Sequence, residues 1–202
     1  MVIESGFRWG AKYMGLNASW LAVQGGDRAT VLEQLGLSEI GLTNDELESK
    51  YCCAELPTGW FLVFSNRGSL NPSRKAAALS RNGHVLVAEM VESVMYSRCS
   101  AWRNGQQIWD VEYNAEDDEG DVSVSGEPPP EFAAIRARLS KEQDELDGVD
   151  LLLDIPIELS ASVCGFADPL GKTRSGLTFS KLEPVRGGSP LSFLKGLFGR
   201  SS

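Results

Sequence analysis

Apolar residues in the first half of the chain are concentrated in short runs, each bounded by turn-forming residues. These runs cover residues 19–24, 59–65 and 84–90. A mainly apolar run of this length, followed by glycine or polar residues, is typical of a strand buried on both faces. The pattern therefore predicts three buried strands.

Residues 89–113 carry the clearest local signal, because two β-prone segments flank Asn104-Gly105. This dipeptide favours a type I′ hairpin turn, in which both central residues have a positive φ. A two-residue loop fixes the register. It predicts the facing pairs Arg103–Gln106, Trp102–Gln107, Ser100–Trp109, Arg98–Val111 and Tyr96–Tyr113.

Strand alternation then predicts the composition of the two hairpin faces. The aromatic face, which we expect to lie on the core, holds Tyr96, Trp102, Trp109, Val111 and Tyr113. The opposite face holds Ser97, Cys99, Ala101, Ile108, Asp110 and Glu112.

Helices are predicted where capping residues precede a 3.6-residue apolar repeat. Asp27 precedes a helix with the stripe Val31, Leu32 and Leu35, and Gly36 ends it. Further helices are predicted to begin near residues 72, 130 and 154, each beside a proline. Val122 and Val124 predict an edge strand. Residues 38–56 show no regular pattern beyond a short helix from residue 43 or 44 to residue 47.

These elements predict one α+β domain over residues 1–170. Its sheet is expected to be mixed but mainly antiparallel, with a central β-hairpin flanked by helices. Glycine, serine and proline become frequent after Asp168, and residues 171–202 read as a basic C-terminal tail.

The tail contains the candidate contact residues Leu191, Phe193, Leu194, Leu197 and Phe198. Such a segment could dock on its own acidic domain, fill a partner's groove or touch a membrane surface. Internal docking or disorder is favoured over an anchor, because two glycines within the segment weaken a helix.

Charge is distributed unevenly. Residues 1–170 contain 13 Lys/Arg and 27 Asp/Glu, a net −14, whereas residues 171–202 are net +5. An acidic body repels nucleic acid phosphates, so we expect no nucleic-acid partner. Such a body would attract a basic protein partner, although most acidic surfaces serve only solubility.

Cysteine and histidine counts limit the chemistry available. The cysteines at positions 52, 53, 99 and 164 form no C-x-x-C pair, and His84 is the single histidine. A zinc site built on two histidines is therefore excluded, and we predict neither a metal nor a cofactor. No signal peptide or membrane span is evident, so reduced thiols and a cytoplasmic location are expected.

Carboxylates around the hairpin are the remaining candidates for chemistry. Glu89 and Glu92 lie in or beside a predicted strand, and Asp110 and Glu112 share the less apolar hairpin face. Together with Arg103 they are the candidate binding residues. Asp110 and Glu112, with Arg103 and Ser97, could rim a cleft. The simpler interpretation is a solvent-facing sheet surface. The acidic turn at residues 116–121 fails the EF-hand test, because positions 115 and 126 cannot supply the required ligands.

The sequence resembles a group of small uncharacterised bacterial soluble proteins with no known activity. The resemblance covers roughly residues 19–166. It rests on the segments 20–23, 31–37, 59–60, 102–109 and 154–159, with Pro129, Phe132 and Ile135. It implies a bacterial α+β protein and carries over no site.

Two functional hypotheses follow from these observations. The first is a non-catalytic binding or interaction protein with an unidentified partner. It is favoured over an enzyme because no catalytic constellation is present. The second is a small hydrolase-like enzyme that uses the hairpin carboxylates. A pocket containing two or more of Glu89, Glu92, Asp110 and Glu112 would favour the enzyme.

Overall fold

The computed structural model describes residues 16–43, 49–67, 70, 72–117, 121–146, 148–166 and 177–185. Within this part of the chain the strands form one nine-stranded sheet, in the order β2-β9-β3-β4-β1-β5-β6-β7-β8. Every described neighbouring pair is antiparallel. The α+β class is therefore confirmed, but the parallel pairs expected of a mixed sheet are absent from the described strands.

The strands are β1 (Asn17–Gln24), β2 (Leu37–Thr43), β3 (Tyr51–Glu55), β4 (Phe61–Asn66), β5 (His84–Val91), β6 (Tyr96–Arg103), β7 (Gln106–Asn114), β8 (Ser123–Gly126) and β9 (Phe179–Pro184). The helices are α1 (Arg28–Leu35), α2 (Pro72–Leu79), α3 (Glu131–Glu145) and α4 (Ile155–Cys164). Three short 3₁₀ segments are η3 (Ser80–Asn82), η4 (Glu92–Val94) and η5 (Leu152–Asp154).

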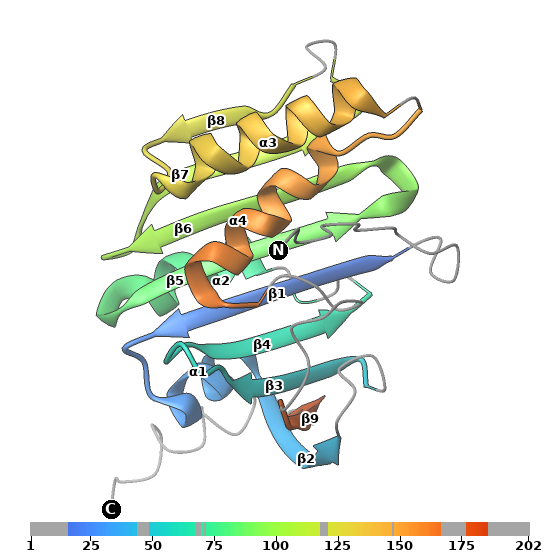
Figure 1. Ribbon diagram of the computed structural model, residues 1–202. Coiled ribbons are helices and arrows are strands. Elements are labelled where there is room, and N and C mark those ends of the chain that lie inside the picture. The colour runs from blue at the N-terminus through green and yellow to red at the C-terminus, as the bar shows by residue number, and fades with distance from the viewer. Residues whose placement is uncertain are drawn as a thin grey trace, which may run out of the picture.

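The sheet is covered by helices on both faces (Figure 1). Helices α3 and α4 lie on the face toward the viewer, and α1 and α2 lie behind the sheet. Helix α4 contacts β5, β6 and β7, whereas α2 contacts β1, β5 and β6. Strand β1 is the middle strand, and the β6–β7 hairpin lies toward one edge.

The core under α3 and α4 is the larger of two hydrophobic clusters. Trp20 of β1 stacks on Phe64 of β4 and meets the edge of Phe166, and all three side chains are fully buried. The Trp20 indole N–H donates to Ser160 Oγ of α4 over 2.9 Å. This hydrogen bond satisfies the buried donor, so the large aromatic side chain can be buried without an unpaired polar atom.

The second core lies under α1 and α2. It contains the α1 stripe predicted from the sequence together with alternate residues of β1, β4 and β5, including Leu21, Val63 and Val87. Asp27 caps α1 by accepting the Thr30 N–H, and the helix ends at Gly36. The central strands are thus apolar on both faces, as the three continuous runs indicated.

The strands and helices predicted from periodicity are present, but residues 38–56 behave differently from the prediction. Instead of irregular chain, they include most of β2 and all of β3. The proposed helix through residue 47 falls largely on residues 44–48, outside the described part of the chain. β2 is an edge strand in which all but the two end residues are exposed. Its residues therefore lack the alternation of apolar and polar positions from which a strand can be predicted.

The hairpin turn is confirmed, but its predicted register is wrong beyond the first residues. Asn104 and Gly105 have φ values of 54° and 79°, and Trp102 pairs with Gln107 as expected. The next pair is Ala101–Trp109, so Ile108 is an extra residue in β7. This β-bulge shifts every later pair by one position and gives Ser100–Asp110, Arg98–Glu112 and Tyr96–Asn114.

Because of the bulge, the two faces of the hairpin hold other side chains than predicted. Trp109, Val111 and Tyr113 do lie in the core under α3 and α4, together with Cys99 and Ala101. Tyr96 and Trp102 are on the opposite face, and Trp102 packs against the core under α1 and α2. A shift of one residue reverses the face of each later side chain.

The sheet continues past residue 170, where composition alone would end the domain. β9 lies between β2 and β3, and its Phe179 and Leu182 are buried. The described part of the region read as a tail therefore completes the sheet. The candidate tail-contact residues at positions 191, 193, 194, 197 and 198 lie outside the described residues.

All four cysteines are buried, and none of them forms a disulfide. Burial raises the pKa of the Cys53 thiol to about 11.

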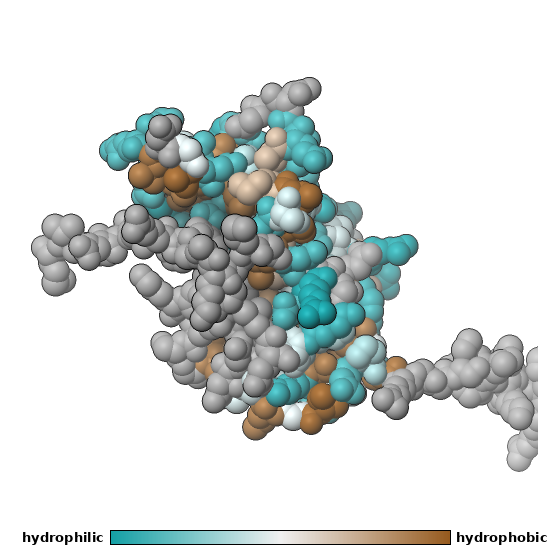
Figure 2. Space-filling view, turned by 90° about the vertical axis from the view of Figure 1, so that its right-hand side faces the viewer, coloured by the Kyte–Doolittle hydropathy of each residue, from teal (hydrophilic) through white to brown (hydrophobic). Residues whose placement is uncertain are grey.

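No helix among the described residues is long and apolar enough to cross a membrane. Ile40 and Leu42 leave more than half of their surface exposed, and Figure 2 shows apolar residues at the lower end of the molecule, where β2 lies.

Candidate functional site

The candidate site is a cluster of charged residues on β5, β6 and β7, on the sheet face that α1 and α2 partly cover. We call Glu89, Arg98, Asp110 and Glu112 the charge cluster. Glu89 pairs with Arg98 across β5 and β6, and Arg98 pairs with Glu112 across β6 and β7. Alternation places Glu89 on the same face as Val87, which belongs to the core under α1 and α2.

Arg98 is at the centre of the charge cluster. Its Nε donates to Asp110 Oδ1 over 2.8 Å, and its Nη2 donates to Asp110 Oδ2 over 2.7 Å. Its Nε is also 3.5 Å from Glu112 Oε2. The two parallel hydrogen bonds to Asp110 fix the guanidinium plane, since this geometry matches the planar carboxylate.

Glu112 keeps most of its accepting capacity. Its Oε2 accepts a hydrogen bond of 3.2 Å from the Tyr96 hydroxyl, and its side chain is 31% exposed. A carboxylate offers about four acceptor positions. The remaining positions can therefore receive donors from solvent or from a ligand.

Glu89 is less committed than Asp110 or Glu112. No described residue donates a hydrogen bond to its carboxyl group or forms an ion pair with it. Burial raises the pKa of Glu89; Arg98 offsets part of that effect, and Glu112 and Asp110 add to it. The same surroundings raise the pKa of the Tyr96 hydroxyl, chiefly through burial. The pKa of Arg98 is also raised, mainly by its hydrogen bonds to Asp110.

The row of paired residues continues from Glu89 into β1. Ser19 pairs with Glu89 in register, and its hydroxyl is buried without a hydrogen-bond partner among the described residues. A buried polar atom with no partner is uncommon and calls for an explanation.

At the other end of the cluster, Trp102 donates its indole N–H to Ser100 Oγ over 3.3 Å.

The structure brings together three of the five candidate binding residues and separates the other two. Glu92 lies in η4 at one end of β5, where its Oε2 accepts the Leu16 N–H over 2.9 Å. Arg103 lies at the opposite end of the hairpin, where its Nη2 is 3.3 Å from His84 Nδ1. The structure therefore places neither Glu92 nor Arg103 beside the other three acids.

Sequence reasoning missed Arg98 and Tyr96 as members of the site. The predicted register placed both on the aromatic face, away from Asp110 and Glu112. The β-bulge at Ile108 brings them onto the same face as the acids. A charged residue in the middle of a β-strand was the available signal, because arginine on a half-buried sheet face normally has a carboxylate partner.

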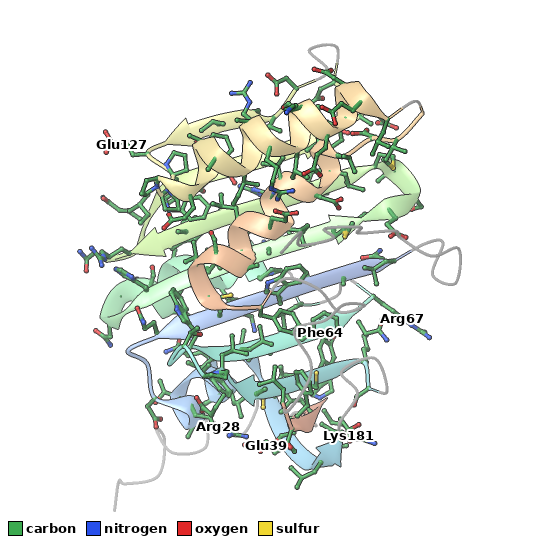
Figure 3. The ribbon with its side chains drawn as sticks, in the orientation of Figure 1. Arg28, Glu39, Phe64, Arg67, Glu127 and Lys181 are labelled. Carbon is green, nitrogen blue, oxygen red and sulfur yellow. The ribbon has the colours of Figure 1, made fainter. Side chains whose placement is uncertain are left out.

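A second charged group connects α1 to the lower part of the sheet. Arg28 Nη2 donates to Glu39 Oε2 over 2.6 Å and to Ser180 Oγ over 3.0 Å, and its guanidinium stacks over the Phe61 ring. Figure 3 shows Arg28 and Glu39 side by side at this end of the molecule. Since Arg28 is held by partners on β2 and β9, we interpret this group as structural.

The arrangement of potential ligands decides whether the described residues can bind a metal ion. No group of three or more His, Cys, Asp or Glu in the described part of the chain has the geometry of a metal site. In the charge cluster, the guanidinium of Arg98 already occupies the position to which Asp110 points. The carboxylates of Glu89 and Glu112 therefore offer acceptor positions that no described residue fills, and the Glu89 carboxyl group is the one whose pKa is raised.

Comparison with known proteins gives no match: no family model, no curated protein and no solved structure is similar to this chain.

Proposed function

We propose that this protein is a non-catalytic binding protein that receives a basic group of a partner protein at the charge cluster of β5–β7. The observation that carries this proposal is the uncommitted, half-buried carboxyl group of Glu89 beside a guanidinium that is already held by Asp110. A buried acid without a partner costs stability, and a ligand that supplies the missing donor would offset that cost.

The charge balance of the cluster supports a cationic ligand. Three carboxylates surround one guanidinium, so the cluster has a net charge of −2 when all three acids are ionised. The whole chain is net −9. A lysine or arginine side chain approaching this face would find unused acceptors on Glu89 and Glu112.

The aromatic residues on the same face fit this type of ligand. Tyr96 and Trp102 are half-buried members of β6 on either side of Arg98 and Ser100. Arginine and lysine contact aromatic rings favourably, and such rings occur often in protein interfaces. Acid and aromatic groups together suit a basic side chain better than they suit a phosphate or a neutral sugar.

The test uses a short arginine-rich peptide as the probe and the change in tryptophan fluorescence or amide NMR shifts as the readout. We expect Glu89→Gln and Glu112→Gln to weaken binding about tenfold each, since a hydrogen bond to a charged group is worth about 1.5–3 kcal/mol. The matched control is Glu145→Gln, an equal charge change on α3, on the other face of the sheet.

Two outcomes would contradict the proposal. If Glu145→Gln weakens peptide binding as much as Glu89→Gln does, the peptide senses only net charge. If binding does not decrease as pH falls through the raised pKa of Glu89, that carboxylate does not hold the cation. Added salt should weaken binding in every variant, because part of the attraction is long-range.

A small hydrolase-like enzyme is the second candidate, and one observation favours it. Glu89 and Glu112 flank Arg98 across two strand spacings, roughly 10 Å between their backbones, and the pKa of Glu89 is raised. A protonated acid opposite an ionised carboxylate is the arrangement used in general acid–base catalysis. Turnover of chromogenic glycoside or ester substrates that is lost in Glu89→Gln would support the enzyme and exclude a purely binding role.

A further inference from the structure

The groove between α1 and α2 carries the opposite charge to the rest of the molecule. A cavity of about 470 Å³ is lined by Gln34 of α1 and by Arg74, Lys75, Ala78, Arg81 and Asn82 of α2 and η3. The chain contains no Asp or Glu between Glu55 and Glu89, although 28 of its 202 residues are acidic. The basic character of this groove is therefore a local property.

The cationic residues share one side of α2 and η3. Arg74, Ala78 and Arg81 are spaced at i, i+4 and i+7, which places them on one face of a helical segment. The small side chain of Ala78 lies between the two arginines and leaves space for a ligand. Neither arginine forms a hydrogen bond or an ion pair with another described residue, so both guanidinium groups have their donors available.

Lys75 is held in place from the opposite wall of the groove. Its Nζ donates to the carbonyl oxygens of Gln34 and Leu35 over 3.1 and 2.9 Å. These carbonyls belong to the last turn of α1, which carries the negative end of the helix dipole. The lysine compensates that negative end, so α1 contributes less repulsion toward an anion.

The backbone next to Arg81 is also fixed. The Asn104 N–H donates to the Ser80 carbonyl oxygen over 2.9 Å, and the Gly105 N–H donates to Ser80 Oγ over 3.1 Å. Ser80 is fully buried. The β6–β7 turn thus holds η3 in position, and Arg81 of η3 lines the cavity.

We infer that this groove is a binding site for a small phosphate-bearing ligand, separate from the charge cluster. Arginine forks and lysine are the side chains best matched to phosphate oxygens. The volume lies in the range of sites for small molecules, about 300–1,000 Å³. A nucleic acid is disfavoured, because it would bring many phosphates toward a chain of net charge −9.

The test is a calorimetric or NMR titration of the full chain with pyrophosphate at constant ionic strength. We expect saturable binding to one site, with affinity reduced about tenfold or more in Arg74→Gln and in Arg81→Gln. Lys141→Gln is the matched control, since it removes one positive charge from an exposed position on α3. It should leave the affinity unchanged.

Three results would overturn this inference. The first two are no saturable binding of pyrophosphate and an equal loss of affinity in the Lys141→Gln control. The third is that a single-stranded oligonucleotide binds more tightly than pyrophosphate, with a salt dependence that indicates many phosphate contacts. Circular dichroism of each variant distinguishes a lost contact from a lost fold. If Arg81→Gln is unfolded, because its side chain lies along the β6–β7 turn, Arg74→Gln decides the outcome alone.

Discussion

Arg98 determines how the charges of the β5–β7 face are arranged. Its side chain is 22% exposed and that of Asp110 is 17% exposed, so neither is fully solvated. Their double hydrogen bond gives each oxygen of the Asp110 carboxylate a donor from the guanidinium. The pair leaves Glu89 and Glu112 on either side of it as the acids that remain available.

Removal of Asp110 should therefore be costly. We expect Asp110→Ala to lower the free energy of unfolding by about 2 kcal/mol, because it leaves a partly buried guanidinium without its main partner. The control is Glu145→Ala, whose exposed pair with Lys141 on α3 should contribute about 0.3–0.5 kcal/mol. Urea denaturation measures both, and equal losses in the two variants would contradict a structural role for the Arg98–Asp110 pair.

Glu89 should have the opposite effect on stability. Burial raises its pKa above the ordinary value of 4.5, so the folded state holds this proton more tightly than the unfolded state does. The free energy of unfolding therefore falls as pH rises from that ordinary value through the raised pKa, because ionised Glu89 destabilises the folded state.

We expect Glu89→Gln to raise the thermal midpoint at neutral pH. This gain should shrink as pH falls toward the ordinary pKa of a glutamate, where the wild-type side chain is also neutral. Thermal denaturation across this pH range measures the effect. A variant less stable than the wild type at neutral pH would show that the ionised carboxylate stabilises the fold.

At the scale of elements, the β-bulge in β7 decides which side chains meet. Ile108 is the extra residue, and Gly126 of β8 lies directly beside it. Gly126 has a φ of 71°, and a Cβ atom at this position would lie 2.2 Å from the Ile108 carbonyl oxygen. Glycine is therefore the residue that allows β8 to pair along the bulged strand.

Gly126→Ala should destabilise the edge of the sheet. We expect a loss of about 2–3 kcal/mol, because the substitution combines an unfavourable positive φ with a backbone clash. Ser125→Ala, an exposed change in the same strand, should cost less than about 0.5 kcal/mol. Hydrogen exchange of the β7 and β8 amides would localise the effect, and equal protection in both variants would contradict it.

At the scale of the whole molecule, β9 joins the C-terminal part of the described chain to the N-terminal half. It pairs with β2 on one side and β3 on the other. Its Phe179 is fully buried in the core under α3 and α4, and Leu182 is buried in the core on the other face. The sheet therefore requires residues that follow the predicted boundary at position 170.

We expect a chain that ends at residue 178 to lose soluble folding, because two strands would lose their neighbour and two cores would lose a side chain. A chain that ends at Arg186 keeps β9 and should retain its thermal midpoint. Phe179→Ala provides the point substitution, with an expected loss of about 3–5 kcal/mol. A shortened chain without β9 that melts at the wild-type temperature would refute this account.

Local signals in the sequence determined most of the individual elements. The continuous apolar runs gave strands buried on both faces, because a sheet with helices on both sides requires apolar residues in both directions. Capping residues and prolines located the helices, and Asn104-Gly105 located the turn. These features depend on interactions within a few residues, so they can be inferred without the fold.

Tertiary structure alone decided how these elements combine. The bulge at Ile108, the place of β9 between β2 and β3, and the strand character of residues 37–43 depend on partners distant in the sequence. The candidate site depends on them as well. Glu89, Asp110 and Glu112 could be selected as acids near a hairpin, but their meeting at Arg98 requires the one-residue shift that the bulge introduces. Register is a property of paired strands, and no single strand contains the information that sets it.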